Sequence, residues 1–201
     1  MTPRVVLLDS GGANLGSVQA AFARLGVDAP VTSDKDVIRN ATHVVLPGVG
    51  AAAGCMAKLR ENGLDQLIPQ ITQPLIGICV GMQLLYERSE ESDTECLGLL
   101  RGAVRLLPSS ESVRVPHMGW NRLDAKSTGA AHPLMAGLEQ ASVYFVHSYA
   151  APPSPESVAT TTHGTPFTAV VARGLVMGAQ FHPERSSASG ARLLRNFLSI
   201  S

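Results

Sequence analysis

The chain has 201 residues, of which 45% are hydrophobic and 16% are charged, so it can bury a sizeable core. The 16 Lys and Arg residues balance the 16 Asp and Glu residues, so no net charge favours binding to nucleic acid or to an anionic membrane. We therefore expect one domain over residues 1–201, with no nucleic-acid or membrane partner.

The amino-terminal segment and the cysteines indicate a compartment. Residues 1–4 lead directly into an apolar run without the length and cleavage site of a signal peptide, and no segment approaches a membrane span. The three cysteines are odd in number and lack CxxC spacing, and zinc-ligand spacing is absent as well. These features predict a cytoplasmic protein without a metal site or a disulfide framework.

The first half of the chain alternates apolar runs with segments of helical periodicity. An apolar run at residues 5–9 precedes a loop and then Leu15, Val18, Phe22 and Leu25, which recur at helical spacing. The loop does not match the dinucleotide pattern Gly-x-Gly-x-x-Gly, because position 13 is alanine, so no such cofactor is expected.

Three more strand and helix units follow. Strands are expected at residues 29–32, 43–46 and 75–78. Helices are expected at residues 33–40, where Ser33 and Asp36 form a capping box, at residues 54–62, and from residue 80 through 86. Repeated units of this kind predict a flavodoxin-like α/β fold, a parallel or mixed sheet with helices on both faces and ligands at the carboxyl ends of its strands.

The second half has a different pattern. Short extended segments predict additional antiparallel strands at residues 103–107, 120–123, 143–149, 158–162, 167–172 and 175–181, before a final helix at residues 188–198. Acidic residues accumulate between positions 87 and 95, where a solvated surface loop explains them without metal binding.

Cys79 lies where a predicted strand turns into a helix. Gly77 and Gly81 flank it at the spacing of a nucleophile elbow, a strained turn that presents a reactive side chain above a parallel sheet. The amino terminus of the following helix would favour the thiolate. The alternative is a small buried apolar cysteine, a common fate of free cysteines.

A nucleophilic cysteine needs a base, and His182 is the best candidate among the six histidines. Pro183 favours an extended conformation at His182, so that Glu184, two residues on, would point to the same side and orient the imidazole. The alternative is a surface His-Pro turn with an unrelated acid.

Acyl transfer also needs two N–H donors for the oxyanion. The amide of Val80 is one candidate, and the other is the amide of Val49, since Gly48 and Gly50 give its loop freedom to aim a peptide into the site. A peptide flip in this loop would switch activity, because one donor contributes on the order of 3 kcal/mol to transition-state stabilisation.

Three segments together carry a family resemblance. In order and spacing, the motifs Pro-Gly-Val-Gly at residues 47–50, Gly-Ile-Cys-Val-Gly-Met-Gln at 77–83 and Gln-Phe-His-Pro-Glu at 180–184 resemble the class I (triad-type) glutamine amidotransferases. Four further segments resemble the subgroup of glutaminase subunits of imidazole glycerol phosphate synthase: residues 9–15, 115–121, 144–149 and 185–187.

The resemblance implies a mechanism and a set of site residues. A triad of Cys79, His182 and Glu184 would hydrolyse L-glutamine through a γ-glutamyl thioester without a cofactor. Gly50, Gln83, His147, Ser148 and Tyr149 would line the glutamine pocket, whereas Asn14, Trp120 and Arg185 would lie near a partner subunit. Trp120 could equally belong to the core, as large aromatic residues usually do.

The resemblance also implies a heterodimer. Ammonia would pass through a channel into a (β/α)8-barrel cyclase subunit of imidazole glycerol phosphate synthase, in histidine biosynthesis. The alternatives are a glutaminase subunit of another ammonia-using synthase, a peptidase or hydrolase on the same frame, and a non-catalytic scaffold. The pairing of His182 with Glu184 and the Met82-Gln83 continuation argue against the peptidase or hydrolase, and the intact triad argues against the scaffold.

Overall fold

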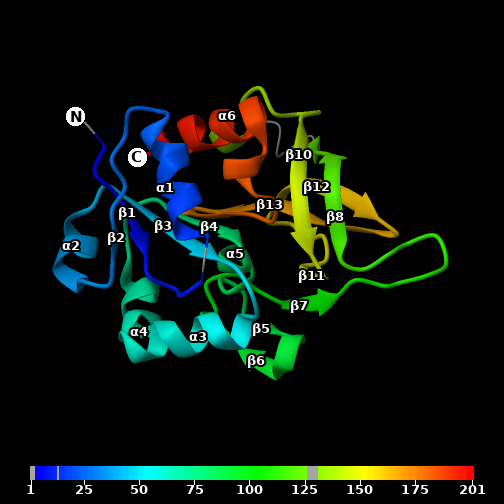
Figure 1. Cartoon of the computed structure of the whole chain (residues 1–201), viewed down its shortest axis with the longest axis horizontal. Helices are drawn as coiled ribbons and strands as arrows, with labels where there is room; N and C mark the ends of the chain where they lie inside the picture. The colour runs from blue at the N-terminus through cyan, green and yellow to red at the C-terminus, as the bar shows by residue number, and fades with distance from the viewer. Residues whose placement is uncertain (1–2, 13, 126–130) are drawn as a thin grey trace.

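A mixed sheet of eight strands forms the centre of the computed structural model, which describes residues 3–12, 14–125 and 131–201 (Figure 1). Its order is β2-β1-β3-β4-β14-β13-β12-β9, parallel from β2 to β14 and antiparallel beyond. The strands are β1 Val5–Leu8, β2 Val31–Thr32, β3 His43–Gly48, β4 Leu75–Cys79, β9 Asp124–Ala125, β12 Ser157–His163, β13 Thr165–Arg173 and β14 Val176–Ala179.

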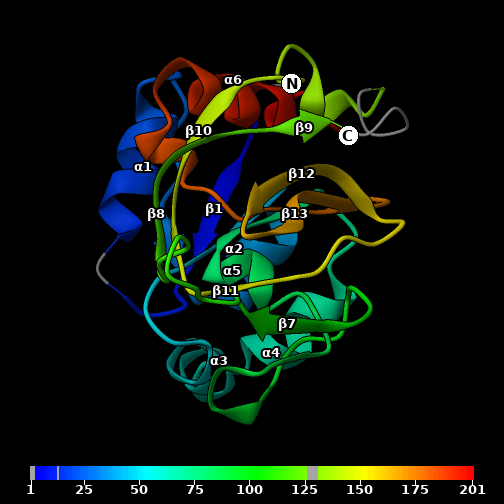
Figure 2. The same ribbon diagram turned by 90° about the vertical axis from the view of Figure 1, so that its right-hand side faces the viewer.

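Helices cover both faces of this sheet. Figures 1 and 2 show α1 (Leu15–Ala23) and α6 (Ser187–Leu198) on one side, and α3 (Ala52–Glu61) and α4 (Leu64–Leu67) on the other. The remaining helices are α2 Lys35–Asn40, α5 Val80–Gln83, and the 3-10 turns η1 Ile68–Gln70, η2 Glu91–Asp93, η3 Pro133–Met135 and η4 Pro183–Arg185. None of the helices in the described ranges is long and apolar enough to cross a membrane.

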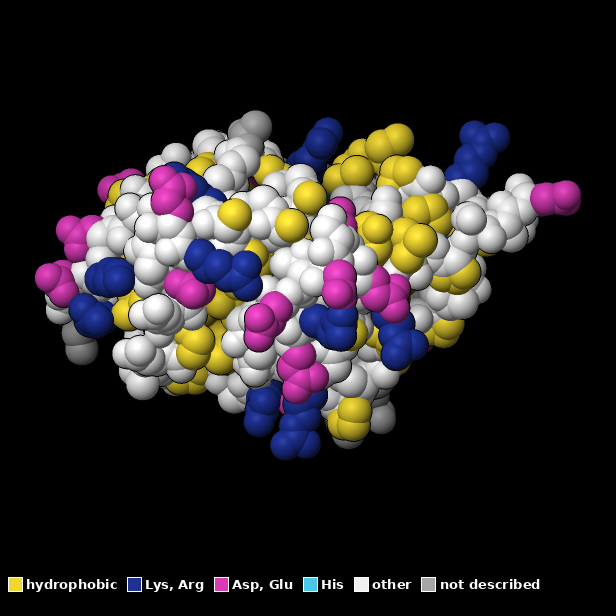
Figure 3. All heavy atoms as spheres, turned by 90° about the horizontal axis from the view of Figure 1, so that it is seen from below, with side chains coloured by type: hydrophobic (Ala, Val, Ile, Leu, Met, Phe, Trp, Pro, Cys, Tyr) yellow, Lys and Arg dark blue, Asp and Glu magenta, His cyan; other side chains and the backbone are white. Residues whose placement is uncertain are grey.

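Two smaller sheets complete the fold. β8 (His117–Arg122) pairs antiparallel with β10 (Ser142–His147), and β11 (Tyr149–Ala150), β7 (Ala103–Leu106), β5 (Arg88–Ser89) and β6 (Thr94–Glu95) form a four-stranded sheet. The face below the main sheet carries acidic and basic side chains interspersed with one another (Figure 3). One ion pair there joins Lys58 and Glu61 of α3.

The predicted fold class is confirmed, with differences at element boundaries. The cap of α2 is Asp34, not Ser33, because the Asp34 carboxylate accepts from the amides of Asp36 and Val37. The helix after Cys79 ends at Gln83. The next residues continue in a tighter turn, in which the Leu85 and Tyr86 amides each donate to the carbonyl three residues earlier.

The predicted strand at residues 143–149 divides into β10 and β11, and the predicted helix at 54–62 begins two residues earlier, at Ala52. The single-domain assignment over residues 1–201 stays a prediction. Position 13, on which the cofactor argument depended, lies outside the described residues.

Candidate active site

Cys79 ends β4 in the middle of the sheet, between β3 and β14, and begins the turn into α5. Its backbone has a φ of 54° and a ψ of −114°, the strained geometry expected of a nucleophile elbow. Val80, the first residue of α5, has a backbone N–H without an acceptor inside the helix, so this amide is available near the sulfur. The structure thus places the cysteine as the glycine spacing indicates.

Close backbone contacts explain the glycines of this turn. A Cβ on Gly81 would lie 1.8 Å from the Leu46 carbonyl oxygen, and one on Gly77 would lie 2.5 Å from the Gly81 oxygen. A Cβ on Gly48, at the end of β3, would lie 2.4 Å from the Gly81 nitrogen. Any side chain at these positions would push α5 away from β3 and β4, and with it the helix amino terminus that faces Cys79.

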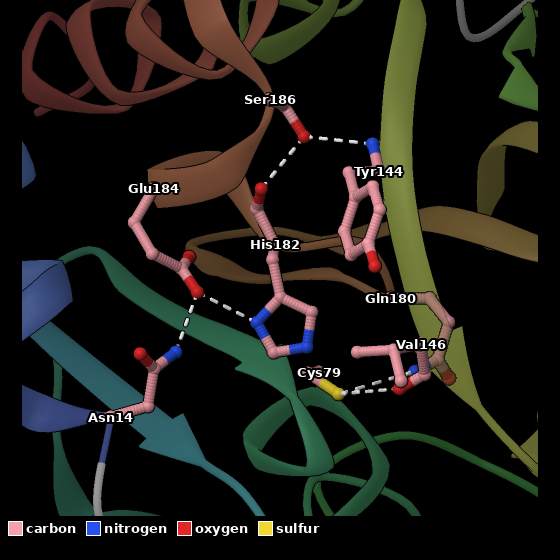
Figure 4. A network of polar contacts seen from close by, with 8 residues as sticks. All are labelled: Asn14, Cys79, Tyr144, Val146, Gln180, His182, Glu184 and Ser186. Carbon is pink, nitrogen blue, oxygen red and sulfur yellow. Dashed lines mark hydrogen bonds and ion pairs between the residues drawn. The ribbon is translucent and has the colours of Figure 1, made fainter. Parts of the chain in front are cut away.

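His182 and Glu184 form a buried pair next to Cys79 (Figure 4). The His182 Nδ1–H donates to Glu184 Oε1 at 2.7 Å, and Asn14 Nδ2 donates to the same oxygen at 2.6 Å. His182 is extended, but Glu184 lies in the turn η4 and reaches back to the imidazole. The predicted pairing is therefore present, although the local backbone is not the extended segment that the sequence suggested.

The electrostatics of the pair favour an imidazolium beside a carboxylate. Burial lowers the pKa of His182, but its pairing with Cys79 and Glu184 has the larger combined effect and raises the pKa to about 10. Burial raises the pKa of Glu184, whereas the hydrogen bond from His182 lowers it below its usual value. His182 can therefore hold a proton near the sulfur at neutral pH.

Ser186 anchors His182 from behind, a role that the sequence analysis did not identify. Its Oγ–H donates to the His182 carbonyl at 2.7 Å and accepts from the Tyr144 amide at 2.9 Å (Figure 4). The His182 amide donates in turn to the Tyr144 carbonyl at 3.0 Å. These bonds fix the segment that carries the imidazole to β10.

A pocket of about 520 Å³ opens at Cys79 and His182. It is lined by both predicted oxyanion residues, by all five predicted glutamine-pocket residues and by two of the three predicted interface residues. These are Val49, Val80, Gly50, Gln83, His147, Ser148, Tyr149, Asn14 and Arg185.

The family model for glutamine amidotransferase class-I matches residues 6–200. The chain belongs to this family. It is 56% identical to the imidazole glycerol phosphate synthase subunit HisH of Xanthomonas axonopodis pv. citri (strain 306), over 98% of both chains. It is 54% identical to the subunit of the same name from Xylella fastidiosa (strain Temecula1 / ATCC 700964), over 98% of this chain and 97% of that protein.

Solved structures of lower identity share the fold of this class I amidotransferase chain. A crystal structure of a glutamine amidotransferase superimposes with a TM-score of 0.73 at 22% identity, covering 96% of this chain and 97% of that one. The structure of PurLQS from Thermotoga maritima gives a TM-score of 0.70 at 18% identity, covering 98% of both chains.

Two side chains hold the Pro47 to Gly50 loop of this amidotransferase domain through its backbone carbonyls. Ser10 is buried and its hydroxyl donates to the Pro47 carbonyl, and the Cys55 thiol contacts the Val49 carbonyl at 3.5 Å. Gly50 has a φ of 86°, the left-handed region that favours glycine. The loop is therefore held by side chains from two other segments, while glycine permits its turn.

Trp120 lies away from the pocket, 55% exposed on β8, so the alternative of a core tryptophan is wrong. Met118 on the same strand is 67% exposed. Nearby, the Arg185 guanidinium lies 4.9 Å from the centre of the Tyr144 ring, and Trp120 packs edge-on against that ring. Met118, Trp120 and Arg185 therefore form an exposed apolar and basic group around the half-buried Tyr144 of β10.

Glu91 is the acidic pocket residue that the sequence analysis missed. It belongs to the segment at residues 87–95, which forms β5, η2 and β6 instead of a plain surface loop. Its Oε2 accepts from the Ala52 amide at the start of α3 at 2.7 Å, and the side chain lines the pocket. Nothing local in the sequence separates Glu91 from the exposed acids around it, because α3 and η2 meet only in the folded chain.

Proposed function

We propose that this chain is the glutaminase subunit of an imidazole glycerol phosphate synthase, which hydrolyses L-glutamine and supplies ammonia to a cyclase partner. The triad of Cys79, His182 and Glu184 at the elbow carries the proposal. The name shared by relatives 54% to 56% identical over nearly the whole chain supports this choice of synthase.

Acylation uses the strained cysteine and the charged histidine. The Cys79 thiolate attacks the side-chain amide carbon of glutamine, and a C–S bond forms as the carbonyl becomes an oxyanion. His182 donates its proton to the amide nitrogen, the C–N bond breaks, and ammonia leaves the γ-glutamyl thioester. The neutral His182 then takes a proton from water, which attacks the thioester and releases glutamate and the thiolate.

The amides of Val80 and Val49 would stabilise the oxyanion. Val80 opens α5, so the positive end of the helix adds to its N–H. Val49 lies on the Pro47 to Gly50 loop and also lines the pocket. The Ser10 bond to Pro47 and the Cys55 contact with Val49 then restrain the orientation of the second donor.

The polar lining suits the α-ammonium group of an amino acid. Gln83 and Glu91 lie in the pocket, and Glu91 supplies the carboxylate to which an α-ammonium group would bind. Gly50, His147, Ser148 and Tyr149 line the same space. We assign these residues to glutamine binding.

The exposed group beside β10 is the proposed docking surface for the cyclase, which we expect to be a (β/α)8 barrel in a heterodimer with this chain. Trp120 is exposed, and Arg185 lines the pocket. Trp and Arg are residue types that are enriched in interface hot spots. Asn14 connects this region to the triad through its bond to Glu184. A partner bound here would cover the pocket and keep ammonia from water.

The test is glutamate release from glutamine by the purified chain, alone and with the cyclase and its nucleotide substrate. We expect low activity alone and strong stimulation in the complex. Cys79→Ser should remove glutamine turnover, while cyclase activity fed with free ammonium survives. Absence of glutamate under both conditions would exclude a glutaminase, and stimulation only by a different synthase would exclude this partner.

A further inference from the structure

The buried side-chain amide of Gln180 lies next to the proposed nucleophile, Cys79, outside the pocket lining. Gln180 follows β14, has no exposed surface and does not line the pocket. Its Nε2 lies 3.9 Å from the Cys79 sulfur (Figure 4). Its Oε1 lies 3.1 Å from Gln83 Nε2. The steps of glutamine hydrolysis described above make no use of this residue.

The orientation of the Gln180 amide is determined by a backbone carbonyl. Gln83 Nε2 lies 2.8 Å from the Tyr149 carbonyl oxygen, which can only accept, so this end of Gln83 is the NH₂ group. The same NH₂ group must then face the oxygen of Gln180. Gln180 is left with its own NH₂ group toward Cys79.

The two neighbours of the sulfur favour different protonation states. The Val146 carbonyl oxygen, 3.9 Å from Sγ, can accept a hydrogen bond from a thiol but only repels a thiolate. The Gln180 N–H interacts more strongly with a thiolate, because hydrogen bonds to ionised acceptors are stronger than those to neutral ones.

We propose that Gln180 is a positioning residue that holds the Cys79 sulfur and favours its thiolate, with Gln83 and the Tyr149 carbonyl fixing the direction of its N–H. Gln180 acts through Cys79 and does not touch glutamine. The inference deepens the proposed glutaminase function and rests on it, since it concerns the nucleophile of that reaction.

The experiment measures alkylation of Cys79 by iodoacetamide as a function of pH, followed on the Cys79 peptide by mass spectrometry. This readout needs no glutamine turnover and separates Cys79 from Cys55 and Cys96. Gln180→Met keeps the length of the side chain and removes the donor. Gln180→Glu keeps an oxygen for Gln83 but presents a carboxylate to the sulfur, and it remains informative if the methionine variant does not fold.

For Gln180→Met we expect the alkylation profile to move up by about one pH unit, so that alkylation on the rising part of the profile is about tenfold slower than in the wild type. For Gln180→Glu we expect a larger displacement, because like charges repel. Glutaminase kcat in the cyclase complex should fall in parallel. Asn196→Leu is the matched control, since Asn196 is another buried amide, bonded from α6 to the Leu134 and Ala136 carbonyls.

The control variant should lose stability but keep the wild-type alkylation profile. A folded Gln180 variant with an unchanged profile would overturn the inference, even if its kcat fell. A wild-type chain that released no glutamate with its partner would instead contradict the proposed function, and the alkylation result would still stand by itself.

Discussion

At the scale of single residues, Glu184 links two parts of the site, because one of its oxygens accepts hydrogen bonds from both His182 and Asn14. Together with the neighbouring Cys79, the negative charge buried at this position outweighs burial and raises the pKa of His182, which keeps the imidazole protonated. The geometry of the base and its charge therefore depend on the same carboxylate.

Replacing Glu184 with Gln tests the charge while leaving an oxygen as acceptor. The pKa of His182 should fall from about 10 toward its usual value, so the proton needed by the leaving ammonia is lost at lower pH. We expect kcat to fall by about 10²-fold and the alkaline limb of the kcat/KM profile to move to lower pH. An unchanged limb would show that the carboxylate charge does not support His182; the exposed Glu61→Gln serves as control.

At the scale of elements, α5 is a four-residue helix held by close backbone contacts, with the side chains of Val80 and Met82 buried in the core. Gly81 brings it against β3, and Gly77 brings it against β4. The strained Cys79 lies between these contacts. The same close backbone contacts therefore stabilise the turn and position Cys79.

The substitution Gly81→Ala tests whether these backbone contacts stabilise the turn. Its Cβ would lie 1.8 Å from the Leu46 carbonyl oxygen, so we expect a loss of at least about 3 kcal/mol in the free energy of unfolding, measured with urea. Gly54→Ala in α3 is the matched control, because nothing lies within 4 Å of its Cβ, and it should stabilise the protein by about 0.5–1 kcal/mol. Equal effects of the two substitutions would refute this account.

The elements also show what sequence could predict. The elbow at Cys79 and the pairing of His182 with Glu184 are local patterns, and their spacing reveals them. Gln180 and Glu91 act through residues roughly forty to a hundred positions away in the chain, so their roles appear only when the sheet is assembled.

At the scale of the whole molecule, a row of buried neutral histidines joins the small sheet of β8 and β10 to the pocket. Asn121 donates to His117, which donates from Nδ1 to His147 Nε2, and His147 donates from Nδ1 to the Tyr149 carbonyl. His163 stacks on His117. Burial lowers the pKa of His117 to about 4 and that of His147 to about 3.

These pKa values predict acid sensitivity of the whole fold. Below pH 6.5 these two histidines bind protons in the unfolded chain, whereas in the folded chain His117 binds one only near pH 4 and His147 only near pH 3. The free energy of unfolding therefore decreases as the pH falls through this range. Each group contributes a slope of up to about 1.4 kcal/mol per pH unit.

Urea unfolding midpoints between pH 7 and 5 provide the measurement. The wild-type midpoint should decline as the pH falls, and His117→Asn should be less stable at pH 7 but show a shallower decline, since it lacks one of these titrations. A variant whose decline is as steep as that of the wild type would assign the acid sensitivity to other groups.

The Tyr149 carbonyl accepts hydrogen bonds from both His147 and Gln83. It belongs to the main chain, so every amino acid at position 149 supplies the same oxygen. Tyr149 also lines the pocket, and its ring is partly buried against the core. A substitution at position 149 should therefore alter the pocket wall while leaving in place the acceptor that orients the buried amide and histidine.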